Sequence, residues 1–101
     1  EIHVFQDASQ IVGYISYSPS SDHVFVDSIA VLPMHHRKGV GSQLLSHAEN
    51  AAVDLGLGSV KLFTDGTIQG NVQFYRRRGY LETDRCEDEG FSRIFYSKAV
   101  A

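Results

Sequence analysis

The sequence predicts an α+β fold built on a mixed β-sheet, in which one helix crosses over between two parallel strands. Alternating and β-branched apolar residues fill most of the first third of the chain, and a helical period replaces them from Gly39 onward. A further strand-like segment, SVKLFTD at 59–65, follows that helix, and the strand–helix–strand order fits a right-handed parallel crossover. With 101 residues, the chain is expected to form a single domain, 1–101.

Three strands are expected before the helix. Residues 1–7 alternate apolar and polar side chains, and residues 10–18 are rich in β-branched and aromatic ones. A polar turn at 7–10 separates these two segments, so they are expected to be hairpin neighbours. Residues 23–33 are apolar on nearly both faces, as expected for a buried central strand, and Pro33 closes the segment.

Two helices and a final hairpin complete the expected order. Apolar residues recur every three or four positions at Val40, Leu44, Leu45, Ala48, Ala51, Ala52 and Leu55. Gly56 then favours a left-handed end to this helix. Residues 67–78 predict a second helix, with Ile68, Val72 and Tyr75 on one side and Gly79 as its stop. Residues 80–100 predict a hairpin with its turn at 87–90.

Composition and charge exclude several classes of function. The net charge of -3 argues against nucleic acid as the main partner, and no apolar run reaches the length of a membrane-spanning helix. A single cysteine, Cys86, rules out an intrachain disulfide and favours a reducing cytoplasm. The five histidines include no i, i+4 pair, and Cys-x-x-Cys is absent, so no metal is expected. The chain does not begin with Met, which is consistent with a trimmed form.

The turn HRKGVGS at 36–42 joins the central strand to the first helix. The first turn of a helix has N–H groups without intrahelical acceptors, and glycines there let a bulky anion approach the backbone. Both the P-loop and the dinucleotide fingerprint are rejected, because the former lacks Gly-Lys-Ser/Thr and the latter lacks its third glycine. Two interpretations remain: a phosphate site, or a tight turn that Gly39 and Gly41 merely shape.

These residues resemble a known family. DSIAVLPMHHRKGVGSQLL at 27–45 is similar to the acetyl-CoA motif of the GNAT N-acetyltransferases, Gln/Arg-x-x-Gly-x-Gly/Ala after a strand. The segment FYRRRGY at 74–80 resembles the second signature of that family, Phe-Tyr-x-Lys/Arg-x-Gly-Phe/Tyr. The gap between the two signatures fits one helix and one strand, as in the family. The sequence departs from the pattern by lacking the family's usual first strand and the two helices after it, so it resembles a short GNAT form.

The resemblance implies acetyl-CoA, or coenzyme A, as the cosubstrate, without a metal. The pantetheine arm would lie along the central strand and the pyrophosphate on the glycine turn, with Arg77 near the 3′-phosphate. His36 stands where the family has Gln or Arg, and Asn71 lies one turn later than the family's usual Asn. The implied cofactor-binding residues are Ile29, Ala30, Val31, His36, Arg37, Lys38, Gly39, Val40, Gly41, Ser42, Asn71, Phe74 and Arg77.

The resemblance also implies an acetyl transfer by direct attack of a primary amine. The N–H of Val31 would polarise the thioester carbonyl, and Tyr75 would protonate the leaving thiolate. Tyr75 also fits the apolar stripe of its helix, so a core role stays open. Asp27 is the best candidate base, since it is expected to share a strand face with Phe25, Ile29 and Val31. A surface carboxylate that binds a cationic substrate is the alternative, and His23 is a lesser candidate base.

The sequence leaves three hypotheses for the function. The first is an N-acetyltransferase acting on a small-molecule or peptide amine. The second is a CoA-binding module without turnover, and the third is a subunit whose fold serves dimerisation. Because the family's missing helices build part of the acceptor side, that side would be open or completed by a second chain in a homodimer.

Overall fold

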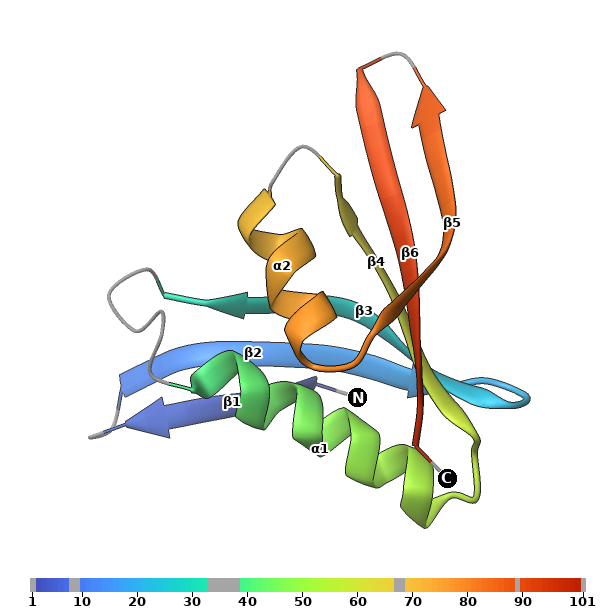
Figure 1. Cartoon of the computed structure of the whole chain (residues 1–101). Coiled ribbons are helices and arrows are strands. Elements are labelled where there is room, and N and C mark those ends of the chain that lie inside the picture. The colour runs from blue at the N-terminus through green and yellow to red at the C-terminus, as the bar shows by residue number, and fades with distance from the viewer. Residues whose placement is uncertain (1, 8–9, 33–38, 67–68, 89, 101) are drawn as a thin grey trace.

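The computed structural model describes residues 2–7, 10–32, 39–66, 69–88 and 90–100. Every element expected from the sequence is present there (Figure 1). The elements in the described residues are β1 (Ile2–Asp7), β2 (Gln10–Pro19), β3 (His23–Val31), α1 (Val40–Asp54), β4 (Ser59–Asp65), α2 (Gln69–Arg77), β5 (Leu81–Asp88) and β6 (Phe91–Ala99). Pro33 and Ile68 lie outside the described residues. None of the described helices is long and apolar enough to cross a membrane.

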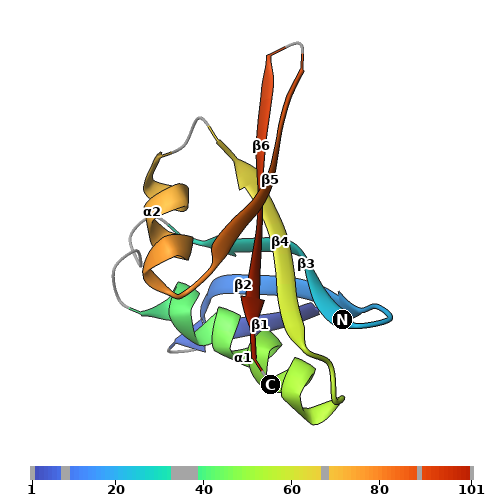
Figure 2. The same cartoon turned by 45° about the vertical axis from the view of Figure 1, so that its right-hand side comes forward.

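The described strands form one mixed sheet in the order β1-β2-β3-β4-β6-β5. All neighbours are antiparallel except β3 and β4, which are parallel, so the expected crossover through α1 is confirmed. The β3–β4 ladder is short and joins His23 with Ser59, Val24 with Val60 and Phe25 with Lys61. Beyond these three pairs the two strands diverge, and the sheet opens between its two halves (Figure 2).

A β-bulge in the middle of β3 changes which side chains face the helices. Ser16 of β2 pairs with Ser28, whereas Tyr17 pairs with Val26, so Asp27 is the extra residue on β3. Val24 and Val26 are buried before the bulge, whereas after it Ile29 and Val31 pack against the core. The expectation that Asp27 shares one face with Phe25, Ile29 and Val31 is therefore wrong. The described part of this segment, residues 23–32, is also less buried than expected, because Asp27 and Ala30 are exposed.

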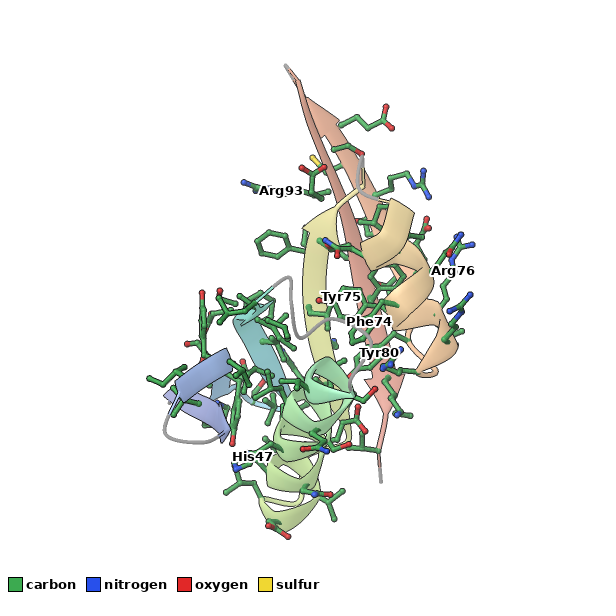
Figure 3. All side chains as sticks on the ribbon, turned by 90° about the vertical axis from the view of Figure 1, so that its left-hand side faces the viewer. His47, Phe74, Tyr75, Arg76, Tyr80 and Arg93 are labelled. Carbon is green, nitrogen blue, oxygen red and sulfur yellow. The ribbon has the colours of Figure 1, made fainter. Side chains whose placement is uncertain are left out.

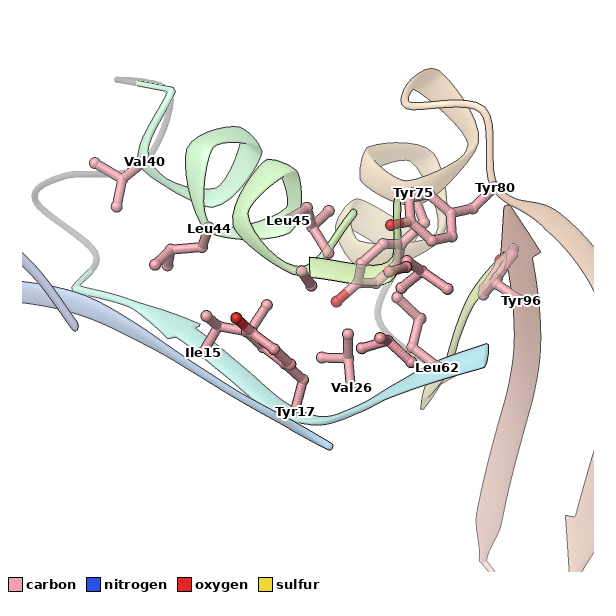
Figure 4. Packing of buried hydrophobic residues seen from close by; sticks show 14 of the residues in the cluster. Ile15, Tyr17, Val26, Val40, Leu44, Leu45, Leu62, Tyr75, Tyr80 and Tyr96 are labelled. Atoms are coloured by element: carbon pink, nitrogen blue, oxygen red, sulfur yellow. The ribbon is translucent and has the colours of Figure 1, made fainter. Parts of the chain in front are cut away.

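The core lies between the sheet and one face of the helices (Figure 4). Helix α1 buries Val40, Leu44, Leu45, Ala48 and Ala52, which confirms most of the expected stripe. Of the two others, Ala51 is half-buried, and Leu55 caps the helix and stays 59% exposed. On the sheet side the buried partners are Val12, Ile15, Tyr17, Val24, Val26, Val60, Leu62, Ile94 and Tyr96.

Both helices end in the same way, in a left-handed glycine that turns the chain back. At the end of α2, Gly79 has φ 87° and its N–H donates to Arg76 O at 3.1 Å, while the N–H of Tyr80 donates to Tyr75 O at 3.1 Å. This pair of bonds is a Schellman motif, which commonly brings together the side chains on either side of the stop. Here those side chains are Tyr75 and Tyr80, whose ring centroids lie 5.9 Å apart. Gly56 has φ 74° after α1, as expected.

Glu49 of α1 links three elements through its carboxylate. It accepts a hydrogen bond of 2.8 Å from the hydroxyl of Tyr80 and one of 3.0 Å from the ammonium of Lys98 on β6. Glu49 and Lys98 are both mostly buried, with side chains 18% and 29% exposed. Charge-assisted bonds in such surroundings are stronger than exposed ion pairs. The position of Tyr80 is thus fixed both by its backbone and by its hydroxyl.

We expect Glu49→Ala to lower the free energy of unfolding by about 2 kcal/mol, because the tyrosine hydroxyl and the ammonium lose their acceptor. Asn50→Ala, at an exposed position one residue on in the same helix, is the matched control and should change stability by less than about 0.5 kcal/mol. Urea unfolding measures both. Equal effects of the two substitutions would show that the carboxylate does not hold these elements together.

Candidate active site

A pocket of about 260 Å³ lies where β3 and β4 diverge. Its walls come from the carboxyl-terminal parts of these two parallel strands and from the helix that follows β4. The lining residues are Val26, Asp27, Ser28, Ile29, Leu62, Phe63, Thr64, Asp65, Asn71 and Tyr75. Four of the residues expected at the site are therefore brought together, although they come from distant parts of the sequence: Asp27, Ile29, Asn71 and Tyr75.

Tyr75 is the most deeply set polar residue of this pocket. Its side chain is 6% exposed and lies among the rings of Phe74, Tyr80 and Tyr96, with centroids 5.2, 5.9 and 5.8 Å away. Burial, with a smaller effect of Tyr96, raises the pKa of Tyr75 to about 12. The phenol therefore keeps its proton at neutral pH and can donate it. Among the described residues, the buried hydroxyl of Tyr96 has no hydrogen-bond partner.

Asn71 and Thr64 form the polar part of the wall beside Tyr75. The Nδ2 of Asn71 donates to the Oγ1 of Thr64 over 3.2 Å, and Thr64 is only 8% exposed. This bond holds the carboxamide at the pocket wall. Sequence reasoning missed Thr64. The available signal was its inward position on β4, two residues after the buried Leu62.

Two carboxylates line the pocket from facing strands, Asp27 on β3 and Asp65 on β4. Both residues are exposed. Asp27 does not share a strand face with Ile29 and Val31, which pack against the core, although Ile29 lines the same pocket. The pocket can accordingly take a positively charged group. Whether Asp27 is a base stays a prediction.

The first turn of α1 is the candidate anion site. Gly39 is its N-cap, with φ 80° and no side-chain cap, and the first turn carries no acidic residue. The N–H groups of Val40, Gly41 and Ser42 point to the open end of the helix, where the dipole favours negative charge. His36, Arg37 and Lys38 lie outside the described residues. The main chain of Ile29, Ala30 and Val31 belongs to the part of β3 that has left β4.

Gly41 has a structural role that neither sequence interpretation includes. A Cβ at this position would lie 2.8 Å from the Cζ of Phe74, which is too close for an unshifted side chain. The ring of Phe74 therefore packs directly on the backbone of α1, and the two helices meet at this glycine. Close approach of a ring, and not only of a phosphate, requires a residue without a side chain here.

The three consecutive arginines at the end of α2 have different surroundings. Arg76 and Arg77 are exposed, and Arg76, labelled on α2 in Figure 3, has its Nη2 3.9 Å from Oε1 of Glu82 on β5. Arg78 turns to α1 instead: its Nε donates to the hydroxyl oxygen of Ser42, and its Nη1 donates to the carbonyl of Phe74 at 3.0 Å. Sequence reasoning named Arg77 for the cofactor and missed Arg78. Its place next to Gly79, where the chain turns back to α1, was the available signal.

Comparison with known proteins decides the family. The family model described as "Acetyltransferase (GNAT) family" matches residues 1–80. The chain belongs to the GNAT acetyltransferase family. A solved structure of the same fold is the ribosomal-protein-S18-alanine N-acetyltransferase of Escherichia coli, with a TM-score of 0.87 at 17% identity, covering 100% of this chain and 69% of that one.

The similar proteins include characterised and uncharacterised members. The chain is 32% identical to the uncharacterised YxbD of Bacillus subtilis strain 168, over 76% of this chain and 47% of that protein. It is 32% identical to a streptothricin acetyltransferase of Streptomyces lavendulae, over 65% of this chain and 35% of that protein. A GNAT acetyltransferase of Elizabethkingia anophelis, solved with acetyl-CoA bound, has a TM-score of 0.83 at 18% identity, covering 97% of this chain and 74% of that one. The chain thus spans less than half the length of the curated relatives that it matches.

We expect Gly41→Ala to lower stability by about 1–3 kcal/mol, because the added methyl overlaps the ring of Phe74. The double variant that also carries Phe74→Leu, which removes the distal ring carbons, should regain part of the lost stability. Gly70→Ala in α2 is the matched control: a Cβ there meets nothing within 4 Å, so helix propensity should make it neutral or stabilising by up to about 1 kcal/mol. A destabilisation of Gly41→Ala that Phe74→Leu leaves unchanged would contradict this contact.

Alkaline pH should destabilise the protein partly through Tyr75. Because its folded-state pKa of about 12 lies above the ordinary tyrosine value of 10.0, the unfolded chain loses this proton first as pH rises. The contribution of Tyr75 is therefore complete below pH 10 and is lost between about pH 10 and 12, a change of about 3 kcal/mol.

Urea unfolding at several alkaline pH values measures this loss, with Tyr75→Phe as the comparison. The variant has no phenol at this position, so its stability should fall less steeply across the same range. Parallel curves for the two proteins would mean that the phenol of Tyr75 titrates alike in the folded and unfolded chains.

Proposed function

We propose that this protein transfers the acetyl group of acetyl-CoA to a primary amine by direct attack. The observation that carries the proposal is the buried Tyr75 in a pocket that opens between diverging parallel strands, with its neighbour Phe74 packed on Gly41 in the first turn of α1. Membership of an acetyltransferase family supports acetyl-CoA as the cosubstrate. The amides of Gly39, Val40, Gly41 and Ser42 would hold the pyrophosphate, and the pantetheine arm would lie along Ile29, Ala30 and Val31.

The proposed reaction has two proton transfers. The amine nitrogen attacks the thioester carbon, with the N–H of Val31 polarising the carbonyl, so that a C–N bond forms and the C–S bond breaks. Tyr75 gives its phenolic proton to the leaving thiolate. The attacking nitrogen gives up a proton to the carboxylate of Asp27, directly or through water. The products are free CoA and an amide, without a covalent enzyme intermediate.

The acceptor that fits this pocket best is a cationic amine. Asp27 and Asp65 line it from opposite strands, and the chain has a net charge of -3. A charged amine would be attracted to this rim and would first release one proton to solvent, because only the neutral nitrogen can then attack the thioester. The similarity to a streptothricin acetyltransferase supports a small-molecule acceptor over a peptide.

Ligand binding and turnover test the proposal separately. Acetyl-CoA and CoA should each raise the melting temperature, since both bind the folded state, whereas ATP should raise it less because it lacks the pantetheine arm. Without stabilisation by either CoA species, the proposal fails. Release of free thiol across a panel of mono- and polyamines then separates an enzyme from a binding module.

Tyr75→Phe should lower the turnover rate by about 10²-fold or more, because general acid catalysis is lost while the ring still packs. Tyr96→Phe is the matched control: its buried hydroxyl has no hydrogen-bond partner among the described residues and does not line the pocket, so it should be dispensable for the rate. Thiol release measured at several pH values gives both numbers. An unchanged rate for Tyr75→Phe would exclude the general-acid role.

A further inference from the structure

Arg78 is the one arginine of the FYRRRGY segment that faces inward, and three contacts fix it. Its Nη1 donates to the carbonyl of Phe74 at 3.0 Å, its guanidinium carbon lies 3.7 Å from the centre of the Phe74 ring, and its Nε donates to the hydroxyl of Ser42. Arginine is suited to such a position because its planar group can stack and donate at the same time. The side chain is half-buried.

The hydrogen bond from Arg78 restricts the direction in which the hydroxyl of Ser42 can donate its own proton. A hydroxyl has one proton to donate and two lone pairs to accept with. Since the oxygen of Ser42 accepts from Nε, its own proton points elsewhere. Ser42 is the third residue of α1, so this hydroxyl stands among the N–H groups of the first turn. The first turn thus gains a side-chain donor in addition to its amides.

The charge of Arg78 lies between two helix ends: the C-terminal end of α2, which favours a cation, and the N-terminal end of α1, which disfavours one. The N-terminal end of a helix carries partial positive charge, and a cation bonded to its first turn adds to that charge. The first turn of α1 contains no acidic residue that would compensate. An anion bound at this turn would offset both positive charges, and the pyrophosphate of CoA is the anion that the proposed function brings there.

We propose that Arg78 is a positioning residue of the cofactor site, which orients the hydroxyl of Ser42 toward the pyrophosphate and adds positive charge behind it. This inference rests on the proposed function. It differs from the role expected for Arg77, which concerns the 3′-phosphate. The position of Phe74 on Gly41 fixes the distance between the two helices and therefore the reach of the guanidinium.

A binding experiment on the full chain with three ligands shows which phosphate groups Arg78 affects. The ligands are CoA, dephospho-CoA, which lacks the 3′-phosphate, and pantetheine, which lacks all phosphates. Titration calorimetry gives the Kd values, with pantetheine measured by competition. Arg78→Gln should weaken CoA and dephospho-CoA alike, by about tenfold or more, because a charge-assisted donor pair is lost. Pantetheine should bind the variant as it binds the wild type. Arg76→Gln, an exposed arginine of the same helix end, should leave all three values unchanged.

A double-mutant cycle tests whether Arg78 acts through Ser42. Ser42→Ala should weaken CoA binding as well, and Arg78→Gln combined with Ser42→Ala should lose little more than the stronger single variant. Arg78→Lys keeps the positive charge but lacks the planar guanidinium with its several donors, so it should recover only part of the affinity for CoA. If Arg78→Gln does not fold, Arg78→Lys and Ser42→Ala decide alone: both must weaken CoA and dephospho-CoA and spare pantetheine.

Three results would overturn the inference. They are an unchanged Kd of CoA, a loss as large for pantetheine as for CoA, and additive losses in the double variant. A wild type that binds no CoA would instead refute the proposed function. A wild type that binds CoA as tightly as its Arg78 variants would refute only the role of Arg78.

Discussion

The candidate site depends on one constraint: β3 and β4 pair in parallel over only three residue pairs. Because the strands are parallel, their carboxyl ends lie at the same edge, and because they pair over so few residues, this edge opens instead of closing. Parallel strands need a crossover, and here the crossover is α1. The open edge and the start of α1 thus arise from one connection, so the pocket and the candidate anion site are neighbours by topology.

A second group of contacts links the pocket to the core, around Tyr75. The Schellman turn at Gly79 brings Tyr80 back onto Tyr75, and Glu49 then fixes the hydroxyl of Tyr80. Core and catalytic interpretations of Tyr75 are not alternatives, since the residue is nearly buried and still lines the pocket. The same packing that excludes water from the phenol keeps it protonated. Stability and the proposed chemistry would therefore depend on the same rings.

The sequence was sufficient for the elements and the family, because periodicity and turn residues act locally. It could not predict the bulge at Asp27, since a run such as VFVDSIAV looks equally apolar in either phase and only the pairing with β2 reveals the extra residue. Gly41 and Arg78 depend on how two helices meet, which no local pattern encodes. Thr64 was missed because threonine is common in β-strands, so its presence in β4 does not by itself indicate a functional site. The expected contacts of His36, Arg37 and Lys38 lie outside the described residues.

The diverging strands also have a consequence for solubility. Where β3 and β4 separate, residues 26–31 and 62–65 of the described structure no longer pair with each other, so the middle of the sheet contains two strand edges. An open edge invites an extended segment of another molecule to add to it, and natural sheets oppose this with charges and bulges. Asp27 is the extra residue of the β3 bulge and also carries a negative charge, and Asp65 adds a second negative charge from the facing strand. The residues that give the pocket its acidic rim would thereby also keep foreign strands out of the gap.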